Sequence, residues 1–145
     1  MLQILFGDIK KGRLTRLPYL IYSLLFNLVV IGIGIGVVLS IGAGEQIING
    51  EIQQAQQKIL SMFSGPLLLI FLVVTILLVF SWYNLMAKRI RDIGIPGWWA
   101  VLAIVILESI ISVNISGEAS SGMHTLIWIV LLLIPSNTFE KTIKP

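Results

Sequence analysis

Cysteine is absent from the sequence, histidine occurs once, and charged residues are scarce. Without cysteine the chain has no disulfide, thiolate metal ligand or cysteine nucleophile, and a single histidine excludes a multi-histidine metal site. Only 12% of the 145 residues are charged and 57% are hydrophobic, with a mean hydropathy of +0.97. A water-soluble domain carries about a quarter charged residues. The composition therefore excludes an ordinary soluble globule, a disordered chain and a nucleic-acid-binding domain.

Long uncharged segments indicate membrane-spanning helices. A helix crosses about 30 Å of hydrocarbon with about 20 mostly apolar residues. Residues 17–42 and 66–87 contain no charged side chain and are long enough to span. Residues 97–115 are also long enough, and Glu108 is their only charged side chain. We therefore predict three spans in these ranges.

The last apolar segment, residues 126–134, is too short to span by itself. With the polar residues before it, it gives a predicted fourth span at 120–136, joined to the third by a turn at 116–119. The alternative is a re-entrant hairpin that never reaches the far side of the membrane. Both interpretations return the C-terminus to the side from which the third span started.

The basic residues predict the orientation of the chain. Cytoplasmic flanks of membrane helices are enriched in lysine and arginine. With four spans, the segments 1–16, 88–96 and 137–145 share one side and contain every basic residue except Lys58. A three-span chain would instead place Lys141 and Lys144 outside. The sequence thus predicts an all-α, polytopic membrane helical bundle, a single domain over 1–145 with both termini in the cytoplasm.

The connecting segments also have helical features. In residues 43–65, one helical face carries Ile48, Ile52, Ala55, Ile59 and Met62, opposite a glutamine-rich face. This pattern predicts an amphipathic helix that lies on, or projects from, the outer side of the membrane. In residues 88–96, a glycine suited to a left-handed helix stop is followed by a proline suited to a first helical turn. We expect this segment to form a short cytoplasmic turn.

Two segments beside the predicted spans have a distinctive pattern. Residues 12–19, GRLTRLPY, precede the first span, and residues 89–99, RIRDIGIPGWW, join the second to the third. They resemble the domain of unknown function 805 family, with its G-R-x-x-R-x-x-Y entry and its R-x-x-D-I-G-x-x-G-W-W turn. The resemblance implies a multi-pass protein of the bacterial inner (plasma) membrane with no established activity. The family usually ends in a Pro-Gly-Thr-like turn and an Asn-Arg-Tyr-Gly tail, from which residues 135–140, PSNTFE, depart.

The cytoplasmic segments supply a candidate basic face. Its members come mainly from the two family-like segments: Arg13, Arg16, Arg89, Arg91, Asp92, Gly94, Gly97, Trp98 and Trp99. Clustered basic side chains beside a membrane bind anionic lipid headgroups, although setting the orientation alone would explain them. The resemblance further suggests an ion-pair network of Arg13 and Arg16 with Arg91 and Asp92.

Three polar residues lie at similar depths in the predicted spans. Glu108, Asn27 and Thr75 are each about 15–18 Å from the cytoplasmic end of their helix, so a shared site near the midplane is geometrically possible. An ionisable residue inside a span indicates a proton, ion or substrate site by default. The alternative is that Glu108 is protonated, or reaches Asn114 and water in an irregular helix.

Gly32, Gly34 and Gly36 form a G-x-G-x-G run within the first span. A dinucleotide fingerprint needs a strand–turn–helix context, which this segment lacks. Gly32 and Gly36 instead form a face of small residues on which another helix packs closely. The partner helix belongs either to this chain or to a second copy.

No nucleophile and base are convincingly paired in the sequence. We therefore expect a non-enzymatic membrane protein without a cofactor, with a structural or interaction role toward lipid, other membrane proteins or further copies of itself. The alternative hypothesis is a small oligomeric transporter that uses Glu108 as its coupling carboxylate. His124 is interpreted as a polar residue near the outer interface.

Overall fold

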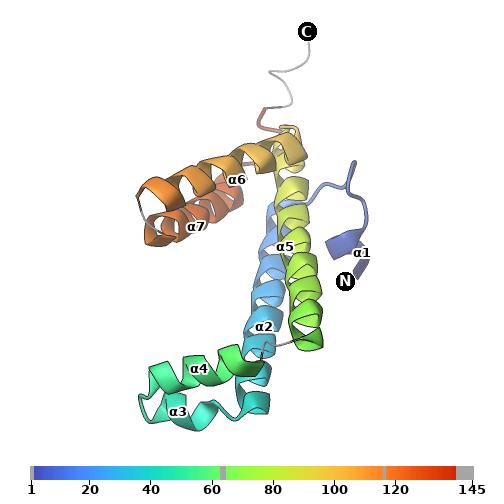
Figure 1. The fold of residues 1–145 in the computed structure, drawn as a ribbon. Coiled ribbons are helices and arrows are strands. Elements are labelled where there is room, and N and C mark those ends of the chain that lie inside the picture. The colour runs from blue at the N-terminus through green and yellow to red at the C-terminus, as the bar shows by residue number, and fades with distance from the viewer. Residues whose placement is uncertain (1, 63–64, 116, 140–145) are drawn as a thin grey trace. The chain divides into compact units, whose positions relative to one another are not determined.

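The computed structural model describes residues 2–62, 65–115 and 117–139. Within them every regular element is a helix (Figure 1), which confirms the predicted all-α class. The helices are α1 (Leu2–Phe6), α2 (Arg16–Ile41), α3 (Gly44–Ile48), α4 (Ile52–Met62), α5 (Pro66–Ile93), α6 (Gly97–Asn114) and α7 (Gly117–Leu133). Lys141 and Lys144, on which part of the orientation argument depends, lie outside the described residues.

Three of the described helices are long and apolar enough to cross a membrane. The apolar stretches are Arg16–Ile41, Leu68–Ile93 and Gly97–Asn114, and Glu118–Leu133 is a shorter apolar helix. Large apolar side chains cover the outside of these helices; Leu28, for example, is 65% exposed. A continuous apolar exterior of this kind is stable in lipid rather than in water. The chain is therefore a helical membrane protein.

Helix α5 extends further than the sequence predicts. Its helical conformation continues six residues beyond the predicted end of the second span, so that only Gly94, Ile95 and Pro96 separate it from α6. Lysine and arginine are good helix formers, and no helix-breaking residue precedes Gly94. The connection is therefore three residues long, a third of the predicted turn at 88–96, and the basic residues of that range belong to the helix.

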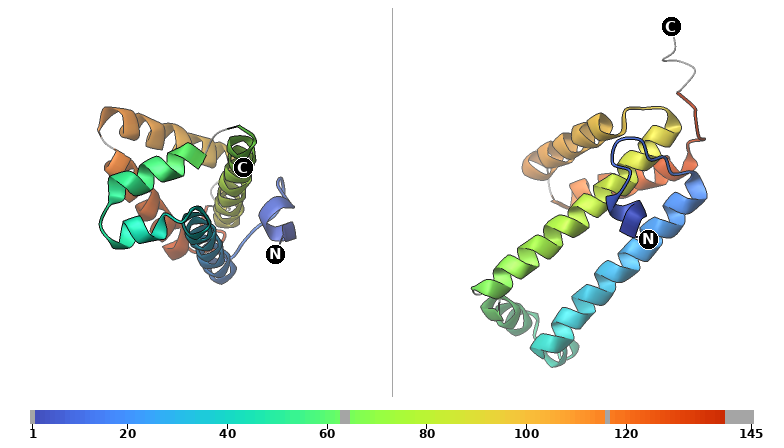
Figure 2. Two further views of the ribbon diagram at one scale, coloured as in Figure 1. Left: turned by 60° about the horizontal axis from the view of Figure 1, so that its bottom comes forward. Right: turned by 90° about the vertical axis from the view of Figure 1, so that its right-hand side faces the viewer.

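Helices α6 and α7 form an antiparallel hairpin and lie side by side in Figure 1 and in the right-hand view of Figure 2. The residues predicted as the turn between them, Gly117 to Ala119, are instead the first turn of α7. Glu118 in that turn complements the positive end of the helix dipole. The helix ends at Leu133, two residues before Pro135, and not at 136 as predicted.

The contacts of the chain divide it into two compact units. The first unit contains Met1–Ser23 and Ser81–Pro145, and the second contains Leu24–Phe80. The first unit thus holds both family-like segments, the end of α5 and the α6–α7 hairpin. The second unit holds the glycine run and the segment predicted to be an amphipathic helix.

In the second unit, the predicted amphipathic helix is two helices, α3 and α4. The break falls at Asn49 and Gly50, because Gly50 adopts a φ of +78°, which glycine tolerates better than other residues. The Nζ of Lys58 donates a hydrogen bond to the carbonyl oxygen of Gly42 at 2.9 Å. Ile48 and Ile52, predicted on one helical face, consequently belong to different helices and are both exposed.

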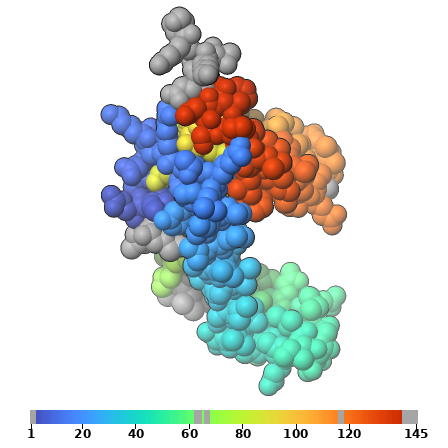
Figure 3. All heavy atoms as spheres, turned by 180° about the vertical axis from the view of Figure 1, so that it is seen from behind, coloured from blue at the N-terminus to red at the C-terminus, as the bar shows by residue number. Residues whose placement is uncertain are grey.

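The core of the first unit is the C-terminal end of α5, and much of it is polar. Residues 84–90 are all buried. Figure 3 shows only small yellow patches of this helix end between the blue N-terminal residues and the red C-terminal residues. Buried polar groups are stable only when they are hydrogen-bonded. The partners of these side chains define the candidate site.

Candidate functional site

The buried end of α5 has two polar faces. Asn84, Lys88 and Arg91 share one helical face because they are spaced by four and three residues. Arg89 and Asp92 lie on a second face, which is turned toward α7. The first face binds the N-terminal segment of the chain, and the second binds the C-terminal segment.

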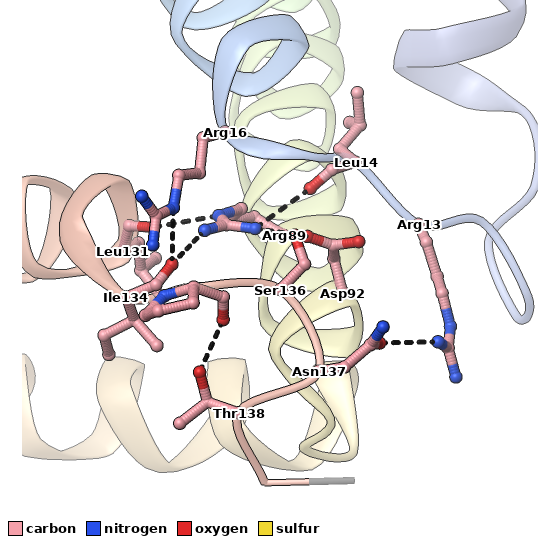
Figure 4. Close-up of polar contacts among 11 residues, drawn as sticks. Arg13, Leu14, Arg16, Arg89, Asp92, Leu131, Ile134, Ser136, Asn137 and Thr138 are labelled. Carbon is pink, nitrogen blue, oxygen red and sulfur yellow. Dashed lines mark hydrogen bonds and ion pairs between the residues drawn. The ribbon is translucent and has the colours of Figure 1, made fainter.

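Arg89 is the centre of the second face (Figure 4). Its side chain is 0% exposed. Its guanidinium forms an ion pair with Asp92 and donates to the carbonyl oxygens of Leu131, at 2.9 Å, and Ile134. It also lies 3.5 Å from the carbonyl oxygen of Leu14. A planar fork of donors suits several acceptors at once, so Arg89 joins the start of α2 to the end of α7.

The carbonyl groups at the end of a helix have no partner within the helix, and here the guanidinium groups supply one. Ile134 accepts a second hydrogen bond from the Nε of Arg16 at 3.0 Å. Cations at a helix C-terminus also complement the negative end of the dipole. Arg16 and Arg89 thus act together as the cap of α7.

The last carbonyl groups of α5 are capped by backbone amides. Gly94, at φ +105°, donates to Arg91, and Ile95 donates to Ile90, which is a Schellman motif. The next two carbonyls, of Asp92 and Ile93, accept from the amides of residues 137 and 139 at 2.7 and 3.0 Å. The predicted left-handed helix stop at Gly94 is confirmed.

Asp92 also holds the C-terminal segment through its side chain. The hydroxyl of Ser136 donates to the carboxylate at 2.6 Å. Asn137 accepts a hydrogen bond from Arg13 at 3.3 Å through its side-chain oxygen. The departure of residues 135–140 from the family pattern therefore does not detach this tail from the site.

The first face of α5 binds backbone carbonyls of the N-terminal segment. Lys88 donates to Ile4 at 2.6 Å, and the amide group of Asn84 donates to Leu5 at 2.8 Å. Arg91 and the indole of Trp98 both donate to Ile9, the latter at 2.9 Å. These side chains bind acceptors within the protein, so they connect the end of α5 to the N-terminal segment.

The ion-pair network suggested by the resemblance differs from the one observed. Asp92 pairs with Arg89 and not with Arg91, because residues three apart on a helix meet whereas adjacent residues diverge. Arg13 and Arg16 reach an amide side chain and a backbone carbonyl instead of Asp92. Trp99, unlike Trp98, points outward and is 76% exposed.

Two glycines of the family-like segments permit close contacts. A Cβ on Gly97 would lie 2.2 Å from the carbonyl oxygen of Ala87, so only glycine allows α6 to approach α5 here. A Cβ on Gly12 would lie 2.8 Å from the carbonyl oxygen of Asp8 and 2.9 Å from the side chain of Lys88. Both glycines are thus required by packing.

Glu108 belongs to a separate cluster in the same unit. Its Oε1 lies 2.8 Å from the Nδ1 of His124 on α7, and the other ring nitrogen of His124, Nε2, accepts a hydrogen bond from the indole of Trp82 at 2.8 Å. The hydroxyl of Ser120 donates to the carbonyl oxygen of Glu108 at 3.2 Å. Glu108 therefore does not reach Asn114, whose amide group binds Ile110.

The other members of the predicted midplane site lie in the second unit. Asn27 on α2 and Thr75 on α5 both have exposed side chains there. The shared site with Glu108 stays a prediction. Gly32 and Gly36 also lie in this unit, and within the described residues no atom comes within 4 Å of a Cβ built on either of them.

Several residues of the site could not be singled out from the sequence. The sequence places His124 near the outer interface but does not show its partners, because Glu108 and Trp82 belong to two other helices. Asn84 and Ser136 bind groups more than 40 positions away. One signal was available: Asn84 and Lys88 are spaced by one helical turn at the end of a span, where a polar pair indicates a bound partner.

The two segments that form this site lie within the part of the chain that matches a known protein family. No curated protein and no solved structure matches the chain. The family described as "Protein of unknown function (DUF805)" matches residues 10–142. That range contains both motifs, the buried end of α5 and the described C-terminal segment. Within the described residues, no three histidine, aspartate or glutamate side chains gather to hold a metal ion. The chain belongs to the DUF805 family.

Proposed function

We propose that this protein is a four-span protein of the bacterial inner membrane, with both termini in the cytoplasm and a non-enzymatic interaction role. In this proposal α7 is the fourth span, and the basic N-terminal segment, residues 10–16, binds anionic lipid headgroups. The protein acts as a membrane-embedded anchor for lipid or for a partner that carries similar acidic groups.

This proposal is supported by a difference between two groups of basic residues. Lys88, Arg89 and Arg91 bind acceptors within the chain. Lys10 and Lys11 instead have exposed side chains at the same end of the unit. Arg13 is exposed as well but donates a hydrogen bond to Asn137. Lys10 and Lys11 therefore provide positive charge at the surface for a ligand outside the chain.

The contacts of the first unit support a common side for the termini. Arg13 binds Asn137, and the amide of Leu14 donates to the carbonyl oxygen of Lys88 at 3.2 Å. The three basic segments therefore meet at one end of the unit. Helix α7 also runs in the same direction as the end of α5, since Trp82 meets His124 and Arg89 meets Leu131 seven residues later on both helices.

Retention of anionic lipid tests the proposal. The variant K10Q/K11Q is purified in mild detergent from membranes that contain phosphatidylglycerol, and the bound lipid is counted by native mass spectrometry. One basic side chain near an anionic surface contributes about 1 kcal/mol, which is about fivefold in binding. We expect at least a fivefold loss of retained phosphatidylglycerol. K58Q, which removes the one basic residue on the opposite predicted side, should retain it, and equal retention by all three proteins refutes the proposal.

Transport is a second candidate function, favoured by the Glu108 cluster. A carboxylate, an imidazole and an indole from three helices form a hydrogen-bonded chain. Ionisable groups inside a span are rare and mark proton or ion pathways. In liposomes with an internal pH-sensitive dye, the native protein should dissipate a pH gradient and E108Q should not. E118Q, which changes an exposed carboxylate on α7, is the matched control.

A further inference from the structure

We propose that Glu108, His124 and Trp82 form a proton-binding site whose occupancy changes the contact between α5 and α7. The inference concerns the same site as the proposed transport function, and its role in the cell rests on that function. The hydrogen bonds themselves show how a proton would act there.

The partners of His124 determine its tautomer. The indole N–H of Trp82 can only donate, so the Nε2 that faces it at 2.8 Å must have a free lone pair. The single hydrogen of a neutral imidazole is then on Nδ1, which faces the carboxylate of Glu108 at 2.8 Å. In this structure His124 is therefore neutral, and it donates to Glu108 while it accepts from Trp82.

His124 cannot take up a proton without losing one of these two hydrogen bonds. The only free lone pair of the neutral ring is on Nε2, where the incoming proton from water binds. Nε2 then becomes a donor that faces the donor N–H of Trp82. The bond between His124 and Glu108 survives and becomes a charge-assisted hydrogen bond. The bond to Trp82 is lost, and the two rings must turn or separate.

The hydrogen bonds of the pair make His124 the proposed acceptor of the proton. A proton on Nε2 leaves the Nδ1–H bond to the Glu108 carboxylate in place, now between opposite charges. Among the described residues, Tyr83 on α5 is a further titratable group that interacts with the charge of Glu108.

The movement would act between helices, because each member of the site belongs to a different one. Trp82 is on α5, Glu108 on α6 and His124 on α7. The rings of Trp82 and His124 have centroids 5.7 Å apart, tilted by 31°. Proton uptake releases α5 from α7 at this point, while α6 and α7 stay joined through Glu108 and His124.

Nitrogen NMR of the intact protein in lipid nanodiscs tests the inference directly. Because the sequence has one histidine, ¹⁵N-histidine labelling reports on His124 alone. At neutral pH we expect the ring hydrogen on Nδ1. On acidification both ring nitrogens should become protonated. In a sample labelled with ¹⁵N-tryptophan, the indole N–H signal of Trp82, assigned by its loss in W82F, should shift over the same pH range.

Two variants make the test specific. W82F removes the donor to Nε2, so the Nε2–H tautomer should appear in the neutral ring, whereas W99F, which changes an exposed tryptophan, should leave the native tautomer unchanged. A neutral ring with its hydrogen on Nε2 in the native protein overturns the inference. So does a histidine that titrates without a change at Trp82, or one that stays neutral while Glu108 takes up the proton.

The experiments distinguish a failure of the inference from a failure of the proposed transport function. If His124 and Trp82 titrate together but the liposomes show no proton flux, the transport candidate falls and the proton-linked contact stands. If flux depends on Glu108 but Trp82 does not respond to pH, transport stands and the proposed coupling is wrong.

Discussion

At the scale of single residues, the most constrained side chain is Arg89. A buried cation is unfavourable unless it is paired and hydrogen-bonded. Arg89 meets this requirement with one carboxylate and with carbonyl groups from the end of α7. Its partners are mostly backbone atoms, which every residue has, so the sequence cannot identify them. This is the physical reason why Arg89 could be named as a motif residue but its role could not be predicted.

Replacing Arg89 should strongly destabilise the protein. R89M leaves the buried carboxylate of Asp92 without its cation and the end of α7 without its cap, for which we expect a loss of about 3–5 kcal/mol in the free energy of unfolding. R89K keeps the charge but loses the fork of donors, so it should be intermediate. Unfolding in detergent micelles, followed by circular dichroism, measures the difference.

R13M is the control for this experiment. Arg13 is an exposed residue of the N-terminal segment, and its replacement should cost less than about 1 kcal/mol. If R89M and R13M unfold at the same denaturant concentration, the central role of Arg89 is wrong.

At the scale of helices, the sequence predicts some helix ends better than others. The ends of α2 and α6 agree within a residue with the predicted spans, because long and almost uncharged runs define them. The stop at Gly94 is predicted correctly, but the predicted span ends at residue 87, six residues before α5 does. The break at Gly50 is not predicted. A run of apolar residues does not show where a helix stops outside the membrane, and a glycine inside an amphipathic pattern indicates a break only if its φ is known to be positive.

The two kinds of glycine in these helices should respond oppositely to alanine. In G97A the new methyl group would lie 2.2 Å from the carbonyl oxygen of Ala87 and force α6 away from α5, which should cost about 1–3 kcal/mol. G36A meets no described atom within 4 Å and replaces a poor helix former, so the stability should stay the same or rise by up to about 1 kcal/mol. Thermal unfolding of the two variants in one detergent compares them; a similar loss in both contradicts the packing assigned to Gly97.

At the scale of the whole molecule, the N-terminal and C-terminal segments meet at the end of α5. Arg13 contacts Asn137, and the amide of Asn137 caps α5. The charge pattern predicts that these segments share one side of the membrane, and the contact between them agrees with this prediction. The sequence alone does not show the contact, since it joins positions more than 100 residues apart.

Cysteine labelling tests this arrangement without background, because the native chain has no cysteine. A membrane-impermeant maleimide added to intact spheroplasts should label K58C but not K11C or T138C. After permeabilisation all three should react, since Lys11 and Thr138 are exposed in the structure. Labelling of T138C in intact spheroplasts would show that the chain crosses the membrane an odd number of times.

The cap on α7 also has a consequence for biosynthesis. Arg89 is translated more than 40 codons before the carbonyl groups of Leu131 and Ile134 that it binds. Until the last helix leaves the ribosome, Arg89 has only Asp92 and the carbonyl oxygen of Leu14 as partners. A product that ends before α7 leaves the remaining donors of a buried cation without acceptors, so we expect such a product to be unstable.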